Sequence, residues 1–276
     1  MGNCNSCPSK NNCNKQDTCT IENNPNNKIK NIIGVMSGKG GVGKSTITSL
    51  IAKQLSKSGY KVGILDADIT GPSIPRLMGV QYERAFSNNG TDIYPIITKE
   101  NIKTMSVNFM VNDESQPVVW KGPLISNTIK QFYKDVMLEE LDYLLIDMPP
   151  GTGDVALTVM QSLPLTGMIM VSVPQDMISM IVSKGVNMAK MLNVNILGVV
   201  ENMSYIECPD CNKKIKLFDG EETDEFLQEN NLDLLGELPM TREIVEITHK
   251  GVEIVSDELD NILTGIVEKI NKKISK

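Results

Sequence analysis

The sequence predicts an α/β fold with three layers, in which a mostly parallel sheet lies between helices. Two observations predict this fold. From Lys30 onward, short β-branched runs alternate with helical patterns, which is typical of crossover units. Apolar side chains make up 41% of the 276 residues, enough to fill one large core. Because no period of roughly 20 to 50 residues recurs, we expect one domain over residues 28–276 rather than a solenoid.

The expected elements follow one another in chain order. Strands are predicted at 32–36, 62–65, 141–146, 168–173 and 196–200, and helices at 154–163 and 177–192. Another helix follows the first strand, because four apolar side chains share one face: Ile47, Leu50, Ile51 and Leu55. The last helix has an apolar stripe from Leu259 to Ile270, which suits either a core helix or a membrane-surface or partner helix. Its polar face mixes acidic and lysine side chains, which favours the core.

Residues 1–27 have a different composition from the rest. They contain nine asparagines, and Met1 and Ile21 are their only sizeable aliphatic side chains. Such a segment buries too little apolar surface to offset its ordering entropy. We therefore expect a flexible tail, unless a metal ties its cysteines together.

Charge and hydropathy exclude two classes of function. The chain has 34 acidic and 27 basic side chains, a net charge of −7, which disfavours a sequence-independent nucleic-acid binder. No apolar run approaches the ~20 residues that a bilayer crossing needs. We expect a soluble, cytoplasmic protein with no nucleic-acid partner and no stable membrane association.

Six cysteines occur in two clusters. Cys208 and Cys211 form a Cys-Pro-Asp-Cys motif, and the N-terminal cluster contains Cys4, Cys7, Cys13 and Cys19. In a reducing compartment, clustered thiols indicate metal binding, redox chemistry or catalysis before structural disulfides.

A glycine-rich loop lies between the first predicted strand and the helix that follows it. The loop reads Gly38, Lys39, Gly40, Gly41, Val42, Gly43, Lys44 and Ser45. Strand, loop and helix in this order predict a phosphate loop, in which backbone N–H groups of residues 38–46, Thr46 included, surround a nucleotide. Lys44 is expected on the β and γ oxygens and the Ser45 hydroxyl on Mg²⁺.

Acidic residues end two of the predicted strands. Asp147 follows a buried apolar run and is expected to hold Mg²⁺, through water. Asp66 and Asp68 end the strand at 62–65. The alternative for these acids is a loop or helix-cap role.

The second lysine of the loop, Lys39, makes the motif resemble the deviant Walker A of the MinD, ParA, ArsA and nitrogenase iron protein superfamily. That resemblance implies a homodimer in which Lys39 reaches the partner's nucleotide. It also implies that Asp66 joins the magnesium shell, that Asp68 orients or activates the attacking water, and that Asn202 contacts adenine. The resemblance thus implies three catalytic residues, Lys39, Lys44 and Asp68, and ATP as the nucleotide. The alternative for Lys39 is a side chain that points into solvent.

Longer phrases narrow the resemblance. They are Asp66–Pro75, Trp120–Pro123, Asp147–Asp154 and Glu201–Ser204, and they are similar to the Mrp/Nbp35 (ApbC-like) iron-sulfur cluster carrier ATPases over roughly residues 30–255. The resemblance implies a P-loop ATPase that hydrolyses ATP slowly and passes a labile 4Fe–4S cluster to apo iron-sulfur proteins. The main alternative is a MinD/ParA-like positioning ATPase at membrane surfaces, which the Cys-Pro-Asp-Cys motif disfavours.

The family resemblance also assigns the thiols. Cys208 and Cys211, in a metal loop near 203–220, supply two cluster ligands and the second subunit supplies the other two. Ligand arithmetic agrees, because a tetrathiolate site needs four sulfurs and a two-fold axis doubles the pair. A zinc site, a redox dithiol and an unliganded pair are the alternatives. Cys4, Cys7 and Cys13 resemble the cysteine-containing tail of the Nbp35 type, with Cys19 in place of that type's first cysteine. The resemblance implies either a second iron-sulfur site in the tail or free thiols that assist cluster capture.

Overall fold

The computed structural model describes residues 21–275 except 70, 89, 111–121, 177–179, 209, 212, 217–220 and 251–255. The four N-terminal cysteines lie outside the described residues, as do Trp120 and Lys121 of the Trp120–Pro123 phrase.

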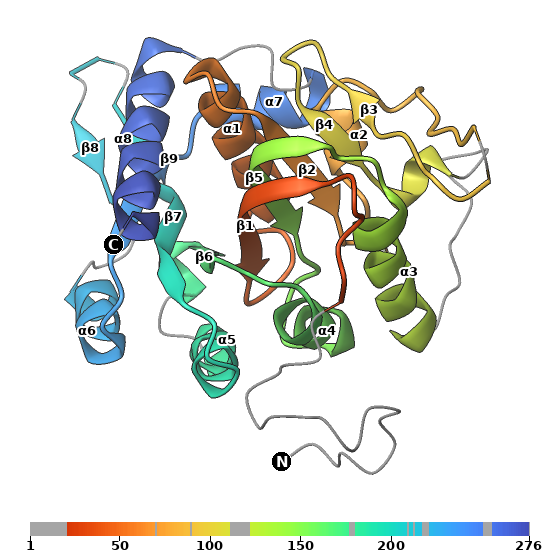
Figure 1. The fold of residues 1–276 in the computed structure, drawn as a ribbon. Helices are drawn as coiled ribbons and strands as arrows, with labels where there is room; N and C mark the ends of the chain where they lie inside the picture. The colour runs from red at the N-terminus through yellow and green to blue at the C-terminus, as the bar shows by residue number, and fades with distance from the viewer. Residues whose placement is uncertain are drawn as a thin grey trace.

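One twisted sheet forms the centre of the molecule (Figure 1). Its strands are β1 (Lys28–Ser37), β2 (Val62–Asp66), β3 (Ile96–Ile97), β4 (Lys103–Met105), β5 (Glu140–Asp147), β6 (Gly167–Ser172), β7 (Ile196–Glu207), β8 (Lys214–Ile215) and β9 (Leu234–Pro239). The spatial order is β3-β4-β2-β5-β1-β6-β7-β8, with β9 also paired to β7. The β3–β4 and β7–β8 pairs are antiparallel, and the other pairs are parallel.

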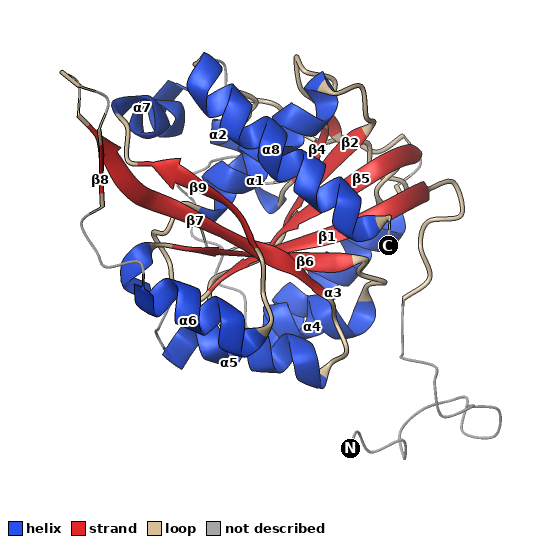
Figure 2. Cartoon of the chain, turned by 90° about the vertical axis from the view of Figure 1, so that its left-hand side faces the viewer, coloured by secondary structure: helices blue, strands red, loops and turns tan. Residues whose placement is uncertain are grey.

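Helices cover both faces of the sheet (Figure 2). They are α1 (Lys44–Lys57), α2 (Ile74–Leu77), α3 (Gly122–Asp135), α4 (Asp154–Ser162), α5 (Met180–Met191), α6 (Glu221–Asn230), α7 (Arg242–Lys250) and α8 (Asp257–Ile274). The apolar core is divided accordingly: α1, α2, α7 and α8 pack on one face, and α3, α4, α5 and α6 pack on the other. The predicted three-layer α/β fold is confirmed.

The last helix closes the core, as its apolar stripe predicts. Five of its side chains are buried on the α1 face of the sheet: Leu259, Leu263, Ile266, Val267 and Ile270. Ser256 caps the helix by accepting a hydrogen bond from the Leu259 N–H, and acidic residues occupy the first turn, where they complement the helix dipole. Among the residues that the structure describes, no helix is both long and apolar enough to cross a bilayer.

One strand runs further than the sequence suggests. The strand predicted to end at Val200 continues as β7 to Glu207, because Tyr205 is buried and its carbonyl accepts a hydrogen bond from the Met240 N–H. The cysteine motif therefore follows a strand directly. The part of the predicted metal loop near 203–220 that precedes Cys208 therefore belongs to the sheet rather than to a loop.

The end of the predicted tail is also ordered. Asn27 is buried, and its side chain donates to the Val136 carbonyl at 2.9 Å and accepts from the Glu139 N–H at 2.7 Å. The Ile21 N–H donates to the Ser162 carbonyl at 2.9 Å. Residues 21–27 thus pack on the domain through amide hydrogen bonds, so the expectation of a flexible tail is wrong for this part.

Replacing Asn27 with alanine tests this docking. The Asn27→Ala variant leaves the Glu139 N–H without its acceptor and removes one of the two donors to the Val136 carbonyl, and we expect it to lower the free energy of unfolding by about 1–3 kcal/mol. Chemical denaturation measures the change, with Asn26→Ala as the control because the Asn26 side chain is exposed. Equal stability of the two variants would contradict the docking.

Candidate functional site

The phosphate loop joins β1 to α1 at the carboxyl edge of the sheet. Gly43 stands immediately before α1 with φ of 83°, a conformation that L side chains rarely adopt. A Cβ at this position would also lie 2.4 Å from the Asn202 Nδ2 atom. The first backbone N–H groups of α1 have no carbonyl partner within the helix, so they form an anion site at its N-terminus.

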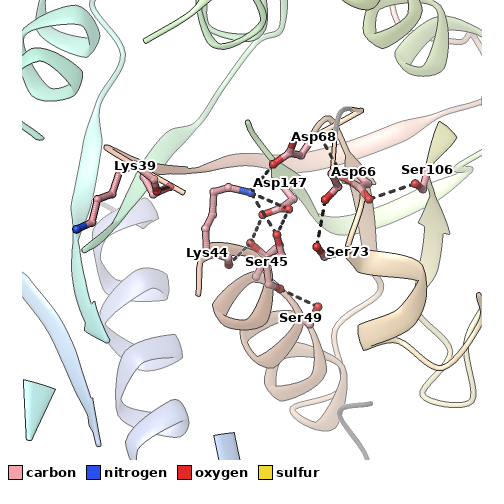
Figure 3. A network of polar contacts seen from close by, with 12 residues as sticks. Lys39, Lys44, Ser45, Ser49, Asp66, Asp68, Ser73, Ser106 and Asp147 are labelled. Carbon is pink, nitrogen blue, oxygen red and sulfur yellow. Dashed lines mark hydrogen bonds and ion pairs between the residues drawn. The ribbon is translucent and has the colours of Figure 1, made fainter. Parts of the chain in front are cut away.

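Asp147, at the end of β5, is the centre of the polar network (Figure 3). Its side chain is fully buried and accepts hydrogen bonds from the Ser45 hydroxyl at 2.6 Å and the Thr48 hydroxyl at 2.8 Å. The Lys44 ammonium lies 2.9 Å from the same carboxylate and is itself buried. A buried charge is costly unless it is paired and hydrogen-bonded, and this carboxylate is both.

Two further carboxylates end β2 beside this network. Asp66 is buried and accepts hydrogen bonds from the Ser106 hydroxyl and the Asp68 N–H, each at 3.1 Å. Burial raises the pKa of the Asp66 carboxyl well above its usual range, and the nearby Asp147 carboxylate adds to the rise. The Asp68 carboxylate lies 3.9 Å from the Lys44 ammonium.

The structure therefore brings together most of the sequence-predicted residues of the nucleotide site. Lys44, Ser45, Asp66, Asp68 and Asp147 form one cluster. Lys39 lies apart: its side chain is exposed and in Figure 3 points away from Lys44.

Two residues of the cluster were not predicted from the sequence. Thr48 lies one helical turn after Lys44, so the helical period of α1 could have indicated that it faces Asp147. Ser106 follows the short strand β4, which has no clear pattern in the sequence, and its contact with Asp66 joins residues 40 positions apart.

The oxygen donors at this edge fit Mg²⁺. Ser45 supplies a hydroxyl, and Asp66 and Asp147 supply carboxylates, which are the ligand types that this hard cation prefers. Within the described ranges, no three His, Cys, Asp or Glu side chains are grouped as a metal site. Bound phosphate would complete the shell, as is usual for magnesium at nucleotide sites.

Asn202, on β7, contacts the phosphate loop at Val42 and Gly43. Its side chain is fully buried, and its Nδ2 atom donates to the Val42 carbonyl at 2.9 Å. Its Oδ1 atom is buried without a hydrogen-bond partner, which is costly for an acceptor unless a ligand supplies a donor.

The cysteine motif lies in the turn of a β-hairpin. β7 and β8 pair through Glu207 and Lys214, and the Cys208 N–H donates to the Lys213 carbonyl at 3.0 Å. Cys208 is half-buried and Cys211 is exposed. Hydrogen bonds from the backbone N–H groups of Asp210 and Cys211, with a further one from the Cys211 thiol, lower the pKa of the Cys208 thiol. Cys208 is thus inclined toward the thiolate form that binds metal.

A second polar network lies at the base of this hairpin. The Ser204 hydroxyl lies 2.5 Å from the Glu201 carboxyl and 2.8 Å from the Glu237 carboxyl, and the Lys216 ammonium lies 2.7 Å from Glu237. The Ser204 hydroxyl has one proton, which the two carboxyl groups share as acceptors. Burial raises the pKa of the Glu201 carboxyl above its usual range. The network joins β7, β9 and the residue after β8.

Comparison with known proteins places the chain in a family. The ParA family model described as NUBPL iron-transfer P-loop NTPase matches residues 28–275. A protein of Clostridium perfringens named iron-sulfur cluster carrier protein is 48% identical over 266 residues, which are 91% of this chain and 93% of that protein. The chain belongs to this family of iron-transfer P-loop NTPases. The resemblance inferred from the sequence phrases is confirmed.

Solved structures agree with the assignment. A nucleotide-binding protein from Archaeoglobus fulgidus, solved in complex with ADP, is 40% identical to this iron-transfer NTPase and superposes with a TM-score of 0.71. The alignment covers 80% of this chain and 86% of the Archaeoglobus chain. The septum site-determining protein MinD of Pyrococcus horikoshii, solved with Mg-ADP, has a TM-score of 0.60 at 21% identity, over 89% of this chain and 97% of its own. The second likeness shows the shared fold alone.

Substitution of Lys44 tests the nucleotide site. Lys44→Ala removes the buried ammonium from the phosphate loop, and we expect ATP affinity to fall by at least about a hundredfold, the cost of removing one partner of a buried charge pair. Calorimetric titration measures affinity, and circular dichroism confirms folding. Lys57→Ala, at the exposed end of α1, is the matched control. Unchanged ATP affinity in Lys44→Ala would refute the assignment.

The second network predicts a pH dependence of stability. The pKa of Glu201 is raised in the folded chain. The contribution of this carboxyl to the free energy of unfolding is therefore complete below its ordinary pKa of 4.5, and it is lost as the pH rises through the pKa of the folded state. Each unit of pKa shift corresponds to about 1.4 kcal/mol. Glu201→Gln should therefore gain stability relative to wild type as the pH rises, in denaturation measured from about pH 4.5 to 8. Exposed Glu229→Gln should show no such trend, and a pH-independent difference for Glu201→Gln would contradict the raised pKa of Glu201.

Proposed function

We propose that this protein is an ATP-dependent iron-sulfur cluster carrier, which binds a labile 4Fe–4S cluster at a homodimer interface, transfers it to apo iron-sulfur proteins and hydrolyses ATP slowly. The observation that carries the proposal is the hairpin with Cys208 and Cys211, in a chain of the iron-transfer P-loop NTPase family. The 48% identical relative that is named as a cluster carrier supports the same function.

The cluster is proposed to bridge two copies of the chain. A 4Fe–4S cluster takes four thiolates, and one hairpin offers two. Because no further His, Cys, Asp or Glu side chain is grouped with this pair as a metal site among the described residues, a second hairpin across a two-fold axis is the simplest source of the others. The exposure of Cys211 leaves the pair accessible to a partner subunit and to a recipient.

The nucleotide half of the site suits ATP and Mg²⁺. Lys44 is proposed to exchange its contact with Asp147 for the β and γ phosphates, and Ser45, Asp66 and Asp147 are proposed to hold the metal, whose charge stabilises the phosphates during hydrolysis. Asp68 orients the attacking water, and Lys39 neutralises the partner's nucleotide. The unpartnered Oδ1 of Asn202 is a fitting acceptor for the adenine amino group. Gly38, Gly40, Gly41 and Thr46 complete the contacts of the loop.

The N-terminal cysteines are assigned an accessory role. We propose that Cys4, Cys7, Cys13 and Cys19 either hold a second cluster or assist cluster capture as free thiols. Both roles leave the shared site at Cys208 and Cys211 intact when the tail thiols are removed.

Removing the hairpin thiols tests the carrier function. The double variant Cys208→Ala/Cys211→Ala should lose the visible absorbance of the shared cluster after anaerobic reconstitution, while ATP binding and the fold persist because both side chains lie at the surface turn of the hairpin. The matched control is Cys4→Ala/Cys7→Ala, which should retain the shared cluster. A full-strength cluster spectrum in the hairpin variant would place the cluster in the tail and refute the proposal.

A further inference from the structure

The nucleotide loop and the cysteine pair are connected by a single strand. Asn202 of β7 donates to the loop carbonyl of Val42, and β7 ends at Glu207, immediately before Cys208. At a rise of roughly 3.3 Å per residue, the six steps from Asn202 to Cys208 span about 20 Å of extended backbone. Asn202 and the residue that precedes Cys208 therefore lie on one strand, β7, which Figure 2 draws as a continuous arrow.

The strand is irregular next to its contact with the phosphate loop. The register between β7 and β9 shifts between Glu201 and Tyr205, so the strand has a bulge or a similar irregularity there. Met203, inside this interval, has φ of 55°. A methionine rarely adopts this left-handed conformation, and its side chain is partly exposed. The local backbone is therefore held in a strained state by its neighbours.

Contacts on both sides hold the bulge. On one side, the fully buried Asn202 amide is fixed to the phosphate loop. On the other, the Ser204 hydroxyl lies between Glu201 and Glu237, and Glu237 pairs with Lys216 beyond β8. Of these contacts, the hydrogen bond from Asn202 to the Val42 carbonyl is the one that reaches the phosphate loop. The Oδ1 atom of the same Asn202 amide has no hydrogen-bond partner.

We propose that Asn202 and Met203 are positioning residues that couple the nucleotide state to the cysteine pair. Nucleotide in the loop changes the bond between Asn202 and Val42, Met203 relaxes toward an extended conformation, and the hairpin that carries Cys208 and Cys211 turns with the strand. Relief of the backbone strain at Met203 drives this change. Glycine adopts the left-handed conformation without strain, so a glycine at position 203 uncouples the two sites. This inference rests on the proposed function, since it assigns the regulation of that cysteine pair.

The test measures thiol reactivity in the apo protein. Alkylation rates of Cys208 and Cys211 are followed by mass spectrometry of their peptide, with and without a saturating non-hydrolysable ATP analogue and Mg²⁺. In wild type, we expect nucleotide to change the rates about fivefold, the low end of coupling between sites. In Met203→Gly the nucleotide effect should disappear, although nucleotide affinity is retained. In Asn202→Ala the rates should no longer respond to nucleotide at saturation.

Asn193→Gly is the matched control. Asn193 has the same φ of 55° but lies after α5, away from the hairpin. It should retain the full nucleotide effect. No nucleotide effect in wild type, or an undiminished effect in Met203→Gly, would overturn the coupling. The alkylation assay uses protein without a cluster, so its result tests the coupling alone. The carrier function is tested separately by anaerobic reconstitution.

Discussion

The buried carboxylate of Asp147 is the constraint on which the nucleotide site depends. A fully buried acid at a strand end is unfavourable unless cations and hydroxyls surround it, and here Lys44, Ser45 and Thr48 do so. These three residues belong to the first two turns of α1, so the same contacts fix the helix and its phosphate loop against β5. The arrangement also prepares the site for ligand, because Lys44 can pair with phosphate and the Ser45 oxygen can bind magnesium.

The architecture places two kinds of chemistry at one end of the sheet. Parallel strands bring Asp66, Asp147 and the phosphate loop to their carboxyl edge, where ligands bind in open α/β folds. β7 crosses this edge and continues into the cysteine hairpin, beyond the parallel part of the sheet. The cluster proposed here, held by two thiols from each of two chains, would suit transfer because Cys208 and Cys211 lie at a surface turn rather than in a core.

The parts of the structure that sequence predicts are those set by local patterns. The phosphate loop, the buried runs ending in Asp66 and Asp147 and the stripe of α8 each follow from a few neighbouring residues. The docking of Asn27 on Val136 and the Glu201–Ser204–Glu237 network depend on partners far along the chain. The extension of β7 likewise required the neighbouring strand β9, which no periodicity in β7 reveals. The N-terminal cysteines remain an expectation.

The proposed carrier function depends most on one cluster shared by two chains. Native mass spectrometry of the anaerobically reconstituted protein without its tail cysteines measures this directly, since it gives the number of chains and the bound iron and sulfide together. We predict a dimer with a single 4Fe–4S cluster. A monomer that holds a complete cluster, or a dimer with one cluster on each chain, would contradict the account.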